Sequence, residues 1–175
     1  MRVKTQHLIS ELSNQHEVIL DAMKILDKVV ASPDPSAGDL ETLLRFAPEF
    51  VDGCHHSIEE YILFSGAGKL GFSLEGPIYV MVSEHGVGRY ISRALDEFYR
   101  AWRAGDASMY GYIYEYAHRY IEHITQHIDK ENNVLFPMLE QNFPEVDSSR
   151  SVDDIESRSG HDAWLRAVDE LKAKY

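Results

Sequence analysis

The chain has 175 residues, of which 44% are hydrophobic and 26% charged, so it can form a domain with a buried core. Its net charge of −12 argues against a general nucleic-acid binder and against a polybasic membrane anchor. A single cysteine, Cys54, excludes an internal disulfide and a cysteine-rich zinc or iron–sulfur site. No apolar run approaches the ~20 residues of a membrane span, and the first residues lack the apolar core of a signal peptide, so we expect a cytoplasmic protein.

Apolar residues recur at helical spacing from the start of the chain. The first such segment covers residues 5–31, and the proline- and glycine-containing stretch 32–38 ends it. A second helix is predicted over about 38–62. Pro48 lies inside this segment and either kinks the helix or marks its beginning. The glycine-rich residues 65–73 are expected to form a loop. A connector between helices is favoured over a phosphate-binding loop, because the lysine-serine/threonine ending of such a loop is missing.

Two further long helices and a tail are predicted in the rest of the chain. The third helix spans about 75–103, and the fourth and longest spans about 107–141. With no alternating strand pattern, the fold class is all-α, an up-and-down four-helix bundle over residues 1–146. Residues 147–175 are expected to form a polar linker and a short amphipathic C-terminal helix. Packing of that helix back on the bundle is favoured over a role in partner binding or dimerisation.

Two stretches of the chain repeat one pattern. Each has a histidine, a glutamate four residues later, an apolar residue three further on, and then Leu-Phe. They are His55-His-Ser-Ile-Glu59-Glu-Tyr-Ile-Leu-Phe and His127-Ile-Asp-Lys-Glu131-Asn-Asn-Val-Leu-Phe. Four residues make about one helical turn, so the histidine and glutamate of each copy share a helix face.

At about 100° per residue, each of the four helices places one histidine on its apolar side. These histidines are His16, His55, His85 and His127. On the second helix this projection favours the pair His55 and Glu59 and turns His56 and Glu60 towards the flank. Glu122 is likewise expected to be solvated. His123 lies one turn before His127, where it is a metal ligand, a donor to a ligand or a satisfied core histidine.

Two inward glutamates need neutralisation in an apolar core, and the inward face offers little cationic partner except Arg89. Four or five histidines with two carboxylates suit a pair of divalent cations held between facing helices. Nitrogen and oxygen donors without thiolate favour iron, manganese or zinc. The sequence therefore predicts a di-metal site in the bundle core.

With these residues placed, the chain resembles the hemerythrin-like family, the HHE cation-binding domains, over roughly residues 8–140. The resemblance rests on the two repeated stretches, on Gln15-His16, and on Gly76-Pro-Ile-Tyr-Val-Met-Val-Ser-Glu-His85-Gly-Val-Gly-Arg89. It implies a left-handed four-helix bundle around two iron ions with oxo or hydroxo bridging. Members of the family bind oxygen, sense oxygen or iron, or react with nitric oxide and peroxide.

The chain departs from the oxygen-carrying hemerythrins at two points. Arg89 stands where they have a second histidine on the third helix, and the fourth helix has His-x3-Glu in place of His-x4-Asp. The pattern looks more like bacterial HHE proteins and di-iron repair proteins, with four histidines and two bridging glutamates. The missing histidine leaves one coordination position open, which His123 could fill. The candidate metal ligands are therefore His16, His55, Glu59, His85, His127 and Glu131, with His123 as a possible seventh.

These features lead us to expect a di-iron protein, with manganese or zinc as alternative metals, that binds or senses oxygen, nitric oxide or iron. It would have no nucleic-acid or membrane partner and would be a monomer or homodimer. The expectation leans towards binding rather than enzymatic turnover. The alternatives are an oxidoreductase acting on nitric oxide or peroxide, in stress defence or iron–sulfur repair, and a structural or storage metal bundle.

Overall fold

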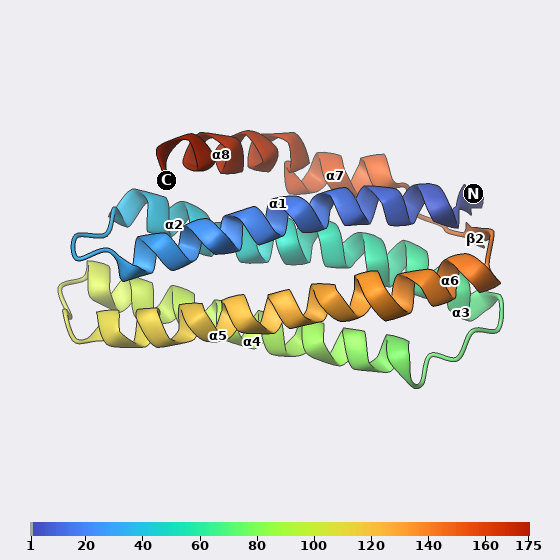
Figure 1. The fold of residues 1–175 in the computed structure, drawn as a ribbon, viewed down its shortest axis with the longest axis horizontal. Helices are drawn as coiled ribbons and strands as arrows, with labels where there is room; N and C mark the ends of the chain where they lie inside the picture. The colour runs from blue at the N-terminus through green and yellow to red at the C-terminus, as the bar shows by residue number, and fades with distance from the viewer. Residues whose placement is uncertain (1) are drawn as a thin grey trace.

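Residues 2–175 are described by the computed structural model, in which four long helical arms run up and down (Figure 1). The predicted all-α four-helix bundle is confirmed. The first arm is α1 and the third is α4; the second and fourth are each continuous series of shorter segments. Their bounds are α1 Thr5–Ala31; α2 Ala37–Phe46, η1 Ala47–His56, η2 Glu59–Phe64 and α3 Ser65–Lys69; α4 Pro77–Arg103; α5 Met109–Lys130, η3 Glu131–Leu135 and α6 Phe136–Asn142.

The ends of the arms follow local sequence signals. The bounds of α1 are those that its apolar period predicts, and Leu8, Leu12 and Ile19 on its inner face are each at most 1% exposed. Ser36 caps α2, because its hydroxyl accepts a hydrogen bond from the backbone N–H of Asp39. The apolar spacing of α1 and the cap of α2 are thus local features of the sequence that define helix bounds without long-range contacts.

The second and fourth arms widen into π-helical turns where they carry the repeated histidine–glutamate pattern. Segments η1, η2 and η3 are these turns, whose hydrogen bonds span five residues rather than four. Pro48 lies in the first turn of η1 and neither begins nor breaks the arm. A π turn rotates each residue by less than the 100° of an α-helix, so neighbouring side chains point in more similar directions.

The glycine-rich segment predicted as a loop is partly helical. Residues 65–69 form α3 and extend the second arm, so the loop prediction was wrong there. Gly66 is buried, and a Cβ atom at this position would lie 2.7 Å from Cβ of Val146. The glycine therefore permits close packing of α3 against a neighbouring segment rather than a turn.

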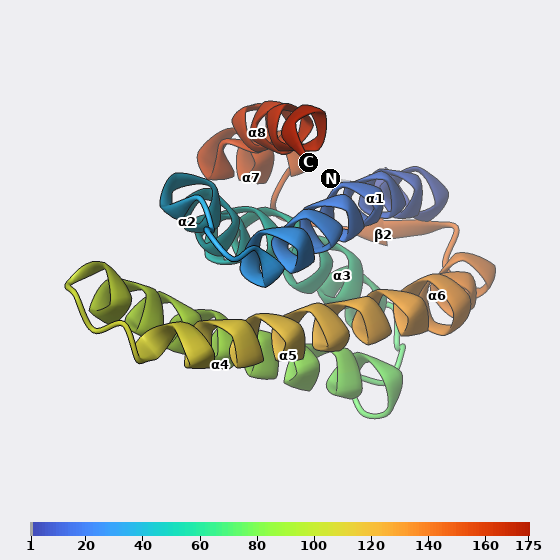
Figure 2. The same cartoon turned by 60° about the vertical axis from the view of Figure 1, so that its left-hand side comes forward.

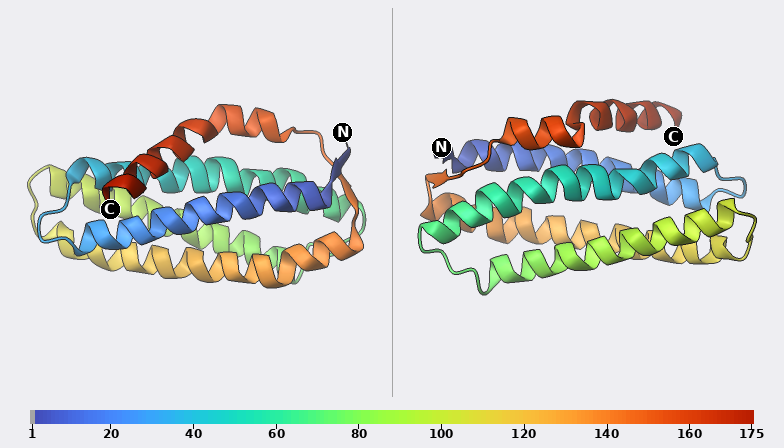
Figure 3. Two further views of the ribbon diagram at one scale, coloured as in Figure 1. Left: turned by 45° about the horizontal axis from the view of Figure 1, so that its top comes forward. Right: turned by 180° about the vertical axis from the view of Figure 1, so that it is seen from behind.

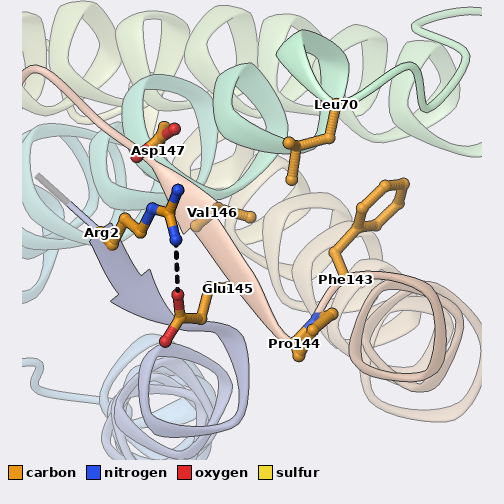
Figure 4. Close-up of a pocket in the computed structure, with 7 residues that line it drawn as sticks. All are labelled: Arg2, Leu70, Phe143, Pro144, Glu145, Val146 and Asp147. Atoms are coloured by element: carbon orange, nitrogen blue, oxygen red, sulfur yellow. Dashed lines mark ion pairs between the residues drawn. The ribbon is translucent and has the colours of Figure 1, made fainter.

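That neighbouring segment belongs to a small sheet that the sequence did not predict. β1 (Arg2–Lys4) pairs antiparallel with β2 (Glu145–Asp147), with Val3 opposite Val146. In Figure 4 the side chain of Arg2 is turned towards the carboxylate of Glu145 on β2. Its Nη1 lies 3.8 Å from Oε2 of Glu145. Strands of three residues are too short to show an alternating pattern, so only their pairing reveals them.

Two helices follow the bundle. α7 (Val152–Ser159) lies in the stretch expected to be a polar linker, and α8 (His161–Lys174) is the predicted tail helix. Figures 2 and 3 show both on the side of the molecule away from the α4–α5 hairpin, where α7 packs on η1 and α8 packs on α1 and α2. The ring of Trp164 meets that of Phe46 edge-on, with 5.8 Å between centroids. The tail therefore packs back on the bundle.

In the part of the chain that the structure describes, no helix combines the length and apolarity that crossing a bilayer requires.

Replacing Gly66 with alanine should lower the free energy of unfolding by about 1–3 kcal/mol, because the added methyl group clashes with Val146. The matched change is Gly111→Ala on α5, where a Cβ atom has no neighbour within 4 Å. That change should raise the free energy of unfolding by roughly 0.5–1 kcal/mol through helix propensity alone. Urea unfolding measures both, and equal stabilisation by the two changes would refute close packing at Gly66.

Candidate metal centre

Seven side chains that can ligate metals are buried together in the bundle core. Each is at most 3% exposed, and together they come from all four arms. They are His16 on α1, His55 and His56 on η1, Glu59 on η2, His85 on α4, His127 on α5 and Glu131 on η3.

These side chains form two groups, in each of which the potential ligand atoms lie within 4.8 Å of one another. The first half-site is His16, His55, Glu59 and Glu131. The second half-site is His56, Glu59, His85 and His127. Glu59 belongs to both, so the two half-sites adjoin.

Each glutamate directs one oxygen to each half of the centre. Oε1 of Glu59 lies 3.4 Å from Nε2 of His55, and its Oε2 lies 3.3 Å from Nε2 of His85. Oε2 of Glu131 lies 3.2 Å from Nε2 of His16, and its Oε1 lies 3.3 Å from Nε2 of His127. Each carboxylate could therefore contact a cation in either half-site.

The donor atoms of the centre are under-satisfied by protein partners. All four oxygens of Glu59 and Glu131 are buried and lack a well-formed hydrogen bond from any described residue. The Nε2 atoms face each other in pairs, at 3.0 Å for His16 and His55 and 3.1 Å for His85 and His127. Buried polar atoms without partners are rare in folded proteins, and cations placed among these atoms would satisfy them. The residues present therefore fit metal ions.

Amide side chains orient the histidines of the first half-site. Nδ1 of His55 lies 3.1 Å from the side-chain oxygen of Gln15, and Nδ1 of His16 lies 2.9 Å from that of Asn132. An amide oxygen can only accept, so each Nδ1 carries the proton and Nε2 keeps its lone pair for the centre.

Carboxylates orient the histidines of the second half-site. Nδ1 of His85 donates to Glu60 at 2.8 Å, and Nδ1 of His127 donates to Glu84 at 2.9 Å. Each of these carboxylates also pairs with a cationic side chain: Glu60 with Arg89, and Glu84 with Lys130. Carboxylate partners make an imidazole a more basic ligand than amide partners do. The two half-sites therefore differ electronically despite their similar ligands.

The Leu-Phe ending of each repeated stretch also has a structural role. The ring of Phe64 stacks on His85, with 6.3 Å between centroids, and that of Phe136 stacks on His16 at 5.5 Å. Each copy of the motif therefore supplies a ligand pair of its own and an apolar wall for a histidine of another arm.

Titration of the histidines follows their contacts with the carboxylates. Burial lowers the pKa of His85, but the nearby carboxylates of Glu59 and Glu60 outweigh it and raise the pKa to about 9. Burial also lowers the pKa of His16 and of His127, but the nearby carboxylate of Glu131 helps to raise both above the usual value. Burial also raises the pKa of Glu59, but the surrounding imidazoles hold it well below the usual range.

His56 is the residue that the sequence analysis misplaced. It was assigned to the flank, yet it is 3% exposed and its ring stacks on His85 with 3.8 Å between centroids. Its Nε2 has no hydrogen-bond partner among the described residues, and burial holds its pKa well below the usual value. The projection assumed α-helical rotation, whereas η1 is π-helical, and this allows both His55 and His56 to face inward.

Three other expectations need correction or refinement. Arg89 is not an inward cation but lies at the rim, 34% exposed, paired with Asp52 and Glu60 at 2.7 Å each. Glu60 lies at the flank as expected, with its side chain 20% exposed, but it also holds Nδ1 of His85. His123 stays outside both half-sites, and its Nε2 donates to the backbone carbonyl of Glu84 at 2.8 Å. Glu122 is exposed, as expected.

The family model of the hemerythrin HHE cation-binding domain matches residues 7–139. The chain belongs to this family. A search of curated proteins found no match to the chain. The family's description as a cation-binding domain agrees with the structure, in which the buried histidine and glutamate groups could hold metal.

Helices α7 and α8 lie beyond the matched hemerythrin segment, yet they reach the metal centre. Nε2 of Gln15 donates to Oε1 of Glu156 on α7 at 3.3 Å, while the oxygen of the same amide holds His55. Glu156 lies 3.8 Å from His161 at the start of α8. The C-terminal helices thus fix the amide that orients a histidine of the first half-site.

Replacing Gln15 with leucine, which keeps the volume but removes the acceptor, should weaken metal binding about 10- to 100-fold. Titration against a chromophoric chelator measures this affinity. Gln126→Leu is the control, because Gln126 is exposed on α5 and bonds only Glu122 among the described residues. Equal affinities for the two variants would show that Gln15 does not orient His55 for metal binding.

The raised pKa of His85 predicts two opposite effects of pH. The pKa of His85 is higher in the folded state than the value of about 6.5 for an unfolded chain, so the folded state binds the proton more tightly. At pH values below about 6.5 this proton binding stabilises the fold fully. This stabilisation is lost as pH rises towards about 9, so metal-free protein should melt at lower temperature at pH 9 than at pH 6.5. Metal ions compete with the same protons, so metal affinity should rise over this range. Calorimetric melts and titrations in buffers of different ionisation enthalpy test both, and a flat melting profile would contradict the prediction.

Proposed function

We propose that this protein holds two iron ions in the two half-sites and uses them to bind or sense a small ligand such as oxygen or nitric oxide. The proposal rests on one observation above all: Glu59 and Glu131 each present one oxygen to each half-site. A single cation would need only one oxygen of each carboxylate. Two bridging carboxylates with terminal imidazoles suit a pair of cations.

The donor set favours iron over zinc. A structural zinc site closes with four ligands in tetrahedral geometry. Here the second half-site alone gathers three imidazoles with a carboxylate, and Glu131 adds an oxygen at 3.3 Å from His127. That number of donors suits a metal of higher coordination number, with imidazole and carboxylate ligands typical of non-haem iron. When bound, iron would supply one-electron redox chemistry and ligand exchange.

The protein's own groups supply orientation and a dry environment. Nδ1 contacts hold four of the five buried rings, and Phe64 and Phe136 cover two of them. Glu60 and Glu84 keep Nδ1 of His85 and His127 protonated, so Nε2 is the available donor in both. Ligand binding rather than storage is favoured because such a fixed, enclosed centre restricts the exchange of the metal itself.

A second candidate is an oxidoreductase acting on nitric oxide or peroxide at the same centre. It is favoured by the cavity that reaches His56 from the surface, since turnover requires repeated access of substrate. Multiple turnovers with a reductant would support this candidate, whereas a single stoichiometric reaction supports binding.

Metal analysis of anaerobically purified protein should find two iron ions per chain, and oxygen or nitric oxide should change its visible absorption. Glu59→Gln and Glu131→Gln should each lower the iron content towards one or fewer, because an amide cannot bridge two cations as an anion does. The exposed Glu122→Gln is the matched control and should keep two. Preferential zinc loading, with no spectral response to either gas, would refute the proposal in favour of a structural metal bundle.

A further inference from the structure

A cavity of about 280 Å³ lies between the second and third arms and extends to the metal centre. Its inner wall contains His56 and Tyr120, each 3% exposed. Its outer part is lined by Arg89 and Arg93 of α4. At roughly 30 Å³ per water molecule, this volume exceeds what a diatomic gas requires. The space suits a ligand of several atoms.

His56 joins the cavity to the second half-site. Its ring stacks on His85, and one of its nitrogens lies within 4.8 Å of potential ligand atoms of Glu59, His85 and His127. Its Nε2 is buried and unpartnered among the described residues. A molecule in the cavity is therefore separated from the metal group by a single side chain.

Gly88 keeps part of this space open. It is buried in the interior of α4, where glycine costs about 1 kcal/mol relative to alanine. A Cβ atom there would touch Nε2 of His123 at 3.6 Å and Cε2 of Tyr120 at 3.9 Å, both ordinary contacts. Alanine would therefore fit, so packing alone does not require the glycine. Without a side chain, Gly88 leaves open the part of the cavity that it lines.

The mouth of the cavity carries the guanidinium groups of Arg89 and Arg93 together with the carboxylate of Asp52. Arg89 is neutralised by Asp52 and Glu60. Arg93 is exposed, its Nε donates to the backbone carbonyl of Arg89, and no described carboxylate pairs with it. A guanidinium group is planar and binds a planar oxyanion through two parallel hydrogen bonds.

We propose that this cavity binds a small planar oxyanion, of the class of nitrite or a short carboxylate, and admits it to the second half-site past His56. Arg93 attracts and holds the anion at the mouth, and Gly88 leaves the room that the anion occupies. The inference rests on the metal centre proposed above only for the last step, passage to the metal.

The first test uses metal-free protein, so it does not depend on iron. Nitrite added to isotope-labelled protein should shift the amide resonances of Gly88 and Arg93, and leave those of Gly86 and Arg100 unchanged. Gly86 and Arg100 lie on the same helix, the former with no neighbour within 4 Å of a Cβ position and the latter paired with Asp96. Arg93→Gln should abolish the shift at Gly88. Nitrite shifts that are absent, or equal at all four positions, would overturn the oxyanion site.

The second test follows nitrite and nitric oxide binding to iron-loaded protein by stopped flow. Gly88→Val should slow association of both ligands by about tenfold or more, because its methyl groups would occupy part of the cavity that Gly88 lines. Arg93→Gln should slow nitrite about three- to tenfold and leave uncharged nitric oxide unaffected. Gly86→Val and Arg100→Gln are the matched controls and should match the unmodified protein.

The outcomes separate the two proposals. Unchanged association rates in a Gly88→Val protein that holds two iron ions would show that ligands reach the centre by another path. Should the valine variant not fold, Gly88→Ala, which makes only ordinary contacts, should still slow association measurably. Failure to load iron would overturn the proposed function, while the resonance shifts of metal-free protein would still decide the oxyanion site.

Discussion

The structure depends on two fully buried carboxylates, those of Glu59 and Glu131. A carboxylate removed from water must be neutralised, because an uncompensated buried charge destabilises a fold by several kcal/mol. Protonated imidazoles can supply that neutralisation in metal-free protein, and cations can supply it in their place. The folded protein therefore requires positive charge beside these carboxylates, either as protonated imidazoles or as metal cations. Protons and metal ions compete for one set of nitrogen and oxygen atoms.

The backbone adapts to this requirement where the repeated motifs lie. An α-helix would bring one histidine of the pair His55 and His56 to the core, whereas the π-helical turns of η1 bring both. The widening occurs again in η2 and η3, which begin at Glu59 and Glu131. π-helical turns are frequent at functional sites. Here the altered backbone hydrogen bonding changes the direction in which the side chains point.

The centre is nearly symmetric in its ligands but not in its surroundings. Amides orient the rings of the first half-site, and the amide of Gln15 is itself held by Glu156 from α7. Carboxylates orient the rings of the second half-site, where Glu60 links His85 to Arg89 at the rim. The cavity opens on that same side. One half is therefore braced by the C-terminal helices, and the other faces the path to solvent.

The sequence by itself determined the bundle, the bounds of α1 and the histidine–glutamate repeat, because apolar period and four-residue spacing are local properties of a helix. It placed His16, His85 and His127 correctly on the inner face for the same reason. The tertiary structure alone decided the position of His56, since backbone hydrogen bonding sets rotation per residue. It likewise decided the link between Gln15 and Glu156, 141 residues apart, because contacts at that separation leave no periodic trace in a single chain.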